Sequence, residues 1–90
     1  MASRKVIIKN KLGLHARPAM MFVETASKYQ AEVSVCRTDQ SEPVDGRSIM
    51  QMMMLAATEG TQLEISATGE DAENAVEALV ELVKSNFQED

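Results

Sequence analysis

The chain has 90 residues and a formal net charge of −5, from fourteen acidic and nine basic side chains. This length suits a single domain, residues 1–90, with one modest hydrophobic core. Because nucleic-acid-binding domains carry a strongly basic face, the acidic balance excludes a general role of that kind. A local basic spot stays open, with Lys11, Arg17 and Arg47 as candidates in or beside expected loops.

The number of cysteines and the length of the apolar stretches indicate the cellular compartment of the protein. Cys36 is the single cysteine, so no internal disulfide is expected and a reducing compartment fits. The first residues contain no apolar run of the kind that a signal peptide needs. No stretch approaches the ~20 apolar residues of a membrane-spanning helix. We therefore expect a cytoplasmic protein that does not insert into membranes.

The first half of the chain alternates strand and helix patterns. Residues 4–9 are predicted to form a short strand, and residues 10–13 a turn. Apolar side chains recur at helical spacing over residues 16–28, which predicts an amphipathic helix. Its apolar stripe consists of Ala19, Phe22, Val23 and Ala26. Residues 31–37 alternate, so Ala31, Val33 and Val35 share one face of a strand. A short strand near Pro43 and Val44 would complete a hairpin.

The second half contains the clearest helix. Residues 48–55 are predicted to form a short helix capped by Ser48. Residues 61–67 alternate, with Leu63, Ile65 and Ala67 on one face. Residues 71–87 form the last helix, which has acidic residues near its start, where the helix dipole favours negative charge. Its stripe consists of Ala72, Val76, Leu79, Val80 and Val83.

The resulting order, β-α-β-β-α-β-α, predicts an α+β fold that resembles a split βαβ unit with an extra helix. We expect an open-faced sandwich, in which three helices cover one face of a four-stranded antiparallel sheet. The other face is left to solvent, as the polar positions of the alternating strands indicate.

The stretch LGLHARPAM, residues 12–20, contains the only histidine, His15, at the start of the first expected helix. The first amides of a helix lack internal partners and attract anions, so the N–H groups of Ala16 and Arg17 form a cradle. Pro18 suits the first turn, and the Arg17 guanidinium suits phosphate oxygens. A nucleophilic nitrogen beside an anion cradle predicts a phosphoryl group held transiently on His15.

Other interpretations of this histidine remain open from the residues alone. His15 is equally compatible with a polar surface residue or a simple anion-binding spot. No partner lies at ligand spacing from it, so no metal site is expected. An enzyme using His15 as general acid or base is disfavoured, because no second catalytic group accompanies it.

Several stretches resemble the HPr family, the histidine-containing phosphocarriers of the bacterial phosphotransferase system. They are GLHARPA (13–19), ASKYQAEVSV (26–35), RSIMQMMML (47–55) and EGTQLEISATGEDAENAVEAL (59–79). The resemblance implies that enzyme I, charged by phosphoenolpyruvate, phosphorylates His15 at Nδ1, and that the group passes to an enzyme IIA. Arg17 would be the electrostatic partner. Such a protein is a stoichiometric carrier, not an enzyme, and we expect a monomer without a cofactor.

The family resemblance also assigns roles to the region around Ser48. It implies regulatory phosphorylation of Ser48 by an HPr kinase/phosphorylase, and a transcriptional regulator as a further partner. Met52 and Leu55 are expected in the core. The expected docking residues for enzyme I and enzyme IIA are Met20, Met21, Ile49, Met50 and Met53. A nitrogen-related or purely regulatory HPr-like protein, acting through partner binding, is the alternative.

The chain departs from the common family pattern in this same region. Gln51 and Ala56 stand where many members have glycine, and Met54 replaces a residue that is often small or polar. Asp45 and Gly46 alter the stretch before Ser48, and the hairpin preceding it looks longer than in many members.

Overall fold

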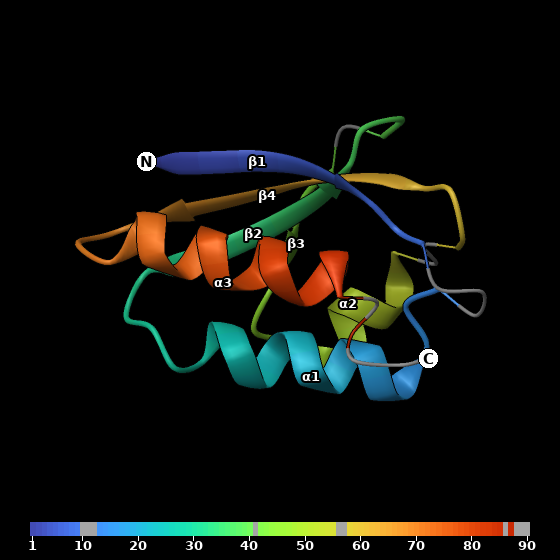
Figure 1. The fold of residues 1–90 in the computed structure, drawn as a ribbon, viewed down its shortest axis with the longest axis horizontal. Helices are drawn as coiled ribbons and strands as arrows, with labels where there is room; N and C mark the ends of the chain where they lie inside the picture. The colour runs from blue at the N-terminus through green and yellow to red at the C-terminus, as the bar shows by residue number, and fades with distance from the viewer. Residues whose placement is uncertain (10–12, 41, 56–57, 86, 88–90) are drawn as a thin grey trace.

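A computed structural model describes residues 1–9, 13–40, 42–55, 58–85 and 87. Its elements confirm the predicted order (Figure 1). They are β1 (Ala2–Ile7), α1 (Ala16–Ala26), β2 (Glu32–Arg37), β3 (Val44–Asp45), α2 (Ile49–Met54), β4 (Gln62–Thr68) and α3 (Ala72–Lys84). The four strands form one antiparallel sheet in the order β1-β4-β2-β3. Figure 1 shows α1 and α3 side by side on one face of this sheet.

Strand alternation separates a buried face from a polar face, as the sequence predicts. Val33 and Val35 of β2 are buried, and so are Leu63, Ile65 and Ala67 of β4. On the opposite face the register aligns Ser3 with Ser66, Ser66 with Ser34, and Ser34 with Asp45. A polar row therefore crosses all four strands, and the helices are confined to the other side of the sheet.

The core lies between the sheet and the helices. Phe22 of α1 and Leu79 of α3 are fully buried, and Met52 contributes from α2. Burial of a side chain of this size contributes roughly 1.5–3 kcal/mol. The predicted stripes of α1 and α3 are confirmed, with Val23 and Val80 only partly buried at the edges of the core. Leu55 is buried beside Met52, as expected.

Two predicted helices end earlier than their patterns indicate. The first was expected to reach Lys28, but α1 ends at Ala26, and the N–H groups of Lys28 and Tyr29 bond the carbonyls three residues before them. The last was expected to reach Phe87, but α3 ends at Lys84. Phe87 has a φ of 56° and is fully buried, because leaving the helical path lets its ring reach the core.

The strand boundaries also move by one or two residues. β1 was expected over residues 4–9 and β4 over residues 61–67, but their ladder pairs Ala2–Ile7 with Gln62–Ala67. The short strand expected near Pro43 and Val44 is β3, one residue further along the chain. Hydrogen bonding to a neighbouring strand decides where a strand begins and ends, and a single segment contains no such information.

Asp71 connects two elements that are far apart in the sequence. It directly precedes α3, and its two carboxylate oxygens accept hydrogen bonds from the backbone N–H groups of Gln30 (2.9 Å) and Ala31 (2.8 Å). The sequence predicts that this carboxylate stabilises its own helix. The carboxylate also fixes the turn that leads into β2, so the start of α3 and the start of β2 are held together.

Candidate functional site

The histidine lies at the N-cap of α1, where the sequence predicts it. Its backbone is extended, with φ −81° and ψ −171°, and its carbonyl accepts the Ala19 N–H at 3.0 Å. Gly13, two residues earlier, has a φ of 68°, a left-handed conformation that glycine adopts without strain. Leu14 and Pro18 are buried on either side. The segment is therefore anchored at both ends and presents His15 at a fixed position.

The imidazole lies beside the exposed first turn of α1. Ala16 and Arg17 are exposed and form the first two residues of α1, whose N–H groups lie before the first helical hydrogen bonds. His15 is half-buried, and its Nε2 atom is shielded from solvent. Lys11, which was named with Arg17 and Arg47 as a candidate for a local basic spot, lies outside the described residues.

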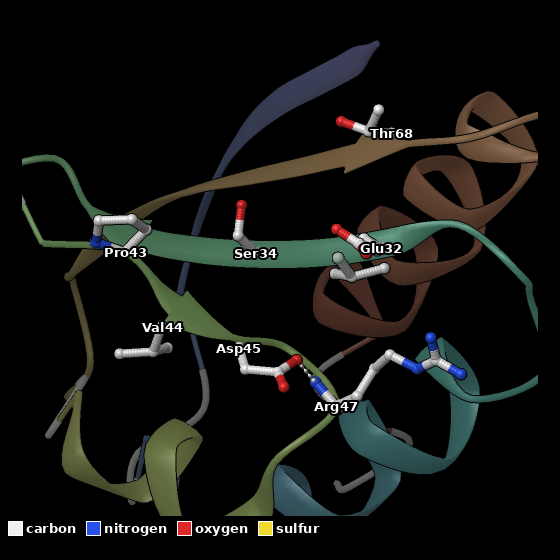
Figure 2. Close-up of a pocket in the computed structure, with 8 residues that line it drawn as sticks. Glu32, Ser34, Pro43, Val44, Asp45, Arg47 and Thr68 are labelled. Carbon is white, nitrogen blue, oxygen red and sulfur yellow. Dashed lines mark hydrogen bonds between the residues drawn. The ribbon is translucent and has the colours of Figure 1, made fainter.

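Ser48 caps α2 as predicted, and its hydroxyl accepts the Gln51 N–H at 3.3 Å. Asp45 organises the preceding turn. One of its carboxylate oxygens accepts the Arg47 N–H at 2.9 Å (Figure 2). The Asp45 carbonyl accepts the Ser48 N–H. Ser48 is half-buried, and the structural role of its hydroxyl in this conformation is to cap α2.

Most of the predicted docking residues are exposed. Met20 of α1 and Ile49, Met50 and Met53 of α2 all belong to this exposed set. Met21 differs, because it is partly buried against the core. The two helices contact each other, and Figure 1 shows α2 beside the end of α1 that follows His15.

Sequence reasoning missed Met54, which is 76 % exposed, as much as Met50. The signal that identifies it is helical spacing. Met50 and Met54 are four residues apart and share a face, whereas the buried pair Met52 and Leu55 is three apart on the other side. Met54 therefore extends the exposed apolar face of α2.

Two surface hollows lie away from this histidine. The larger, of about 550 Å³, is lined by Glu32, Val33, Ser34, Pro43, Val44, Asp45, Arg47 and Thr68 (Figure 2). A second, of about 390 Å³, is lined by residues 37–39 and 59–62. Neither hollow is lined by His15 or Arg17.

The described part of the chain offers little for other kinds of site. It brings no three histidine, cysteine or acidic side chains together in a way that could hold a metal ion. Within the same residues, no helix combines the length and the apolarity that crossing a membrane requires.

Comparisons with known proteins identify the family of this chain. A family model described as "PTS HPr component phosphorylation site" matches residues 2–85. The phosphocarrier protein HPr of Pseudomonas aeruginosa is 48% identical over 89 residues, which cover 99% of this chain and 98% of the relative. The phosphocarrier protein NPr of Escherichia coli is 41% identical over 85 residues, with 94% and 93% covered. The crystal structure of HPr-C-His from Thermoanaerobacter tengcongensis superposes with a TM-score of 0.93 at 43% identity, covering 100% of this chain and 99% of the other.

Fold, site and relatives together define a small α+β phosphoryl carrier. The chain belongs to the HPr family of the phosphotransferase system. A protein of this family carries a phosphoryl group without being an enzyme itself, and its partners are enzyme I and enzyme IIA. The higher identity to HPr than to NPr favours the sugar-transport branch over the nitrogen-related alternative.

Proposed function

We propose that Nδ1 of His15 is the phosphoryl acceptor of this carrier. The observation that carries the proposal is the position of His15 at the N-cap of α1, beside the exposed start of the helix. Nε2 is shielded from solvent, and the family resemblance implies Nδ1 as the atom that accepts the group. Residues 1–90 act as one HPr domain in this proposal.

The transfer needs only the imidazole and its cradle. The Nδ1 lone pair attacks the phosphorus atom carried by enzyme I, and the bond from phosphorus to the donor atom of enzyme I breaks, with the electron pair staying on that donor atom. The N–H groups of Ala16 and Arg17 and the Arg17 guanidinium face the oxygens of the transferred group. Because Ala16 and Arg17 are exposed, the phosphoryl group stays accessible to enzyme IIA, which a carrier requires.

The test is incubation with enzyme I and radiolabelled phosphoenolpyruvate. Wild type should acquire label that is lost in acid and survives in base, as a phosphohistidine does. His15→Ala should acquire none, while Arg17→Lys, which keeps the charge and loses the planar fork, should be labelled more slowly. Absence of label on wild type with a competent enzyme I would refute the acceptor role.

The docking surface consists of Met20, Met21, Ile49, Met50 and Met53, next to the histidine. Exposed apolar clusters mark interaction sites, and methionine adapts its shape to unlike partners. Met50→Glu should slow transfer both from enzyme I and to enzyme IIA. Ile7→Glu is the matched control, because Ile7 is an exposed apolar residue on β1, far along the chain from α2. Equal transfer rates for the two variants would show that the surface is wrongly assigned.

Ser48 is proposed as a regulatory phosphorylation site for an HPr kinase/phosphorylase. A phosphoryl group there would place negative charge beside Ile49 and Met50, at the edge of the docking surface. The phosphorylated form would then serve as the ligand of a transcriptional regulator. Ser48→Asp should lower the rate of His15 phosphorylation by enzyme I, and an unchanged rate would count against this role.

The setting of the carrier completes the proposal. We place it in the cytoplasm, where enzyme I and the soluble domains of enzyme IIA meet it. A monomer suits a protein that presents one face to several partners in turn. Sedimentation at micromolar concentrations would check the monomer directly, because a dimer that covers the docking surface would block transfer.

A further inference from the structure

The helix that carries most of the docking surface is too short to be stable alone. α2 has six residues, whereas isolated helices shorter than about 12 residues are marginal in water. Its direction therefore depends on what holds it to the rest of the molecule. Met52 and Leu55 anchor one side in the core. Two polar side chains, Arg37 and Gln51, make further contacts near its two ends.

Arg37 holds the C-terminal end of α2. Its Nη1 donates to the backbone carbonyl of Leu55 at 3.2 Å, across 18 residues of sequence. The last carbonyls of a helix lack internal partners and carry partial negative charge, which a guanidinium complements. The guanidinium is itself oriented by Asp39, whose two oxygens accept from Nε at 3.0 Å and from Nη2 at 2.9 Å. The Arg37 side chain is only 22% exposed, so it is held in this orientation.

Gln51 holds the N-terminal end. Its side-chain Oε1 accepts the backbone N–H of Asp45 at 2.9 Å, while its own N–H donates to the Ser48 hydroxyl. The first turn of α2 is thereby tied to β3, which belongs to the sheet. Glycine, which many members of the family have at this position, would provide no side-chain acceptor. The hydrogen bond between the Asp45 N–H and the Gln51 side chain therefore depends on the glutamine of this sequence.

We propose that Arg37 and Gln51 are positioning residues for phosphoryl transfer, which hold α2 in the orientation that enzyme I and enzyme IIA bind. The inference rests on the proposed docking role of α2. Neither side chain touches the phosphoryl group in this view. Each acts by raising the fraction of molecules whose exposed methionines are correctly placed relative to His15.

Steady-state kinetics of phosphorylation by enzyme I test this role, with the intact protein as the substrate. Arg37→Met keeps the apolar stem and removes every donor. We expect its KM to rise roughly three- to tenfold at unchanged kcat, which corresponds to a competent fraction of a third to a tenth. Arg4→Met is the matched control, because it removes the same charge from an exposed ion pair between Arg4 of β1 and Glu77 of α3.

Conservative variants separate positioning from folding. Arg37→Lys retains a donor for the Leu55 carbonyl and should recover part of the KM. Gln51→Leu should raise both the KM and the amide exchange of Asp45, whereas Gln51→Glu, which keeps the acceptor oxygen, should leave the exchange of Asp45 at the wild-type rate. Amide hydrogen exchange provides a readout that needs no partner. The exchange of residues 52–55 should rise in Arg37→Met, while exchange in the β1–β4 ladder stays at the wild-type rate.

The outcomes that overturn the proposal are distinct from the failure of the docking surface. If Met50→Glu raises the KM and Arg37→Met does not, the docking surface stands and the positioning role is wrong. If neither raises it, the docking surface is wrong and the positioning role falls with it. If Arg4→Met raises it as much as Arg37→Met, the effect is one of net charge and the proposal is refuted.

Discussion

Gly46 lies where the segment before Ser48 passes closest to the core, and Gly46→Ala tests that packing. A Cβ at this position would lie 2.6 Å from Cγ1 of Val33 and 3.3 Å from Cε1 of Phe22. Both neighbours are buried, and valine is β-branched, so neither can swing away cheaply. The turn itself is fixed by the Gly46 N–H, which donates to the Val33 carbonyl at 2.9 Å.

The expected cost is that of overpacking a closed core, about 1–3 kcal/mol in the free energy of unfolding. For a domain of this size, each kcal/mol lowers Tm by roughly 4–8 °C. Urea denaturation followed by circular dichroism measures the free energy, and thermal melts check it. The ability to accept label from enzyme I should persist at temperatures where the variant is still folded, because His15 lies on a different element.

A double-mutant cycle identifies the contact responsible. Val33→Ala removes Cγ1, so Gly46→Ala should cost less in that background, with a coupling of roughly 0.5–3 kcal/mol between the two sites. If the free energy of unfolding of Gly46→Ala is within about 0.5 kcal/mol of the wild-type value, the close approach of residue 46 to Val33 does not constrain the side chain at that position. If it is destabilised but the two substitutions are additive, the cost comes from the turn and not from Val33.

Three further outcomes are expected. Asp71→Ala leaves the backbone N–H groups of residues 30–31 without their acceptor and should cost roughly 1–3 kcal/mol in urea denaturation; a neutral variant would disprove the link. Phe87→Ala removes a fully buried ring and should lower the free energy of unfolding by roughly 3–5 kcal/mol in urea denaturation. An unchanged free energy of unfolding would show that the Phe87 ring does not pack in the core. Hydrogen bonds from Arg37 lower the pKa of Asp39, so the stability they contribute is complete above about pH 4 and is lost as the pH falls through the lowered value. The free energy of unfolding of Arg37→Met should therefore decline less steeply in acid than that of wild type, and parallel declines would contradict the pairing.

Features that depend on near neighbours in the chain were predictable. Alternation over residues 31–37 and 61–67 identified the buried faces of β2 and β4, because successive side chains of a strand point to opposite sides. The position of His15 at a helix start and the cap formed by Ser48 follow from short local signals as well. The family resemblance then added the chemistry, which position alone left open between phosphoryl transfer and simple anion binding.

Contacts between segments far apart in the chain could not be predicted from these local patterns. Nothing near Asp71 in the sequence indicates that its carboxylate accepts from Ala31, forty residues away. The role of Arg37 is equally hidden, because its partner on α2 is a backbone carbonyl that any residue has. Local sequence sets the period and the caps of each element. Only the packed molecule decides which elements meet, since a hydrogen bond or a buried contact across the chain forms when folding has brought both partners to one place.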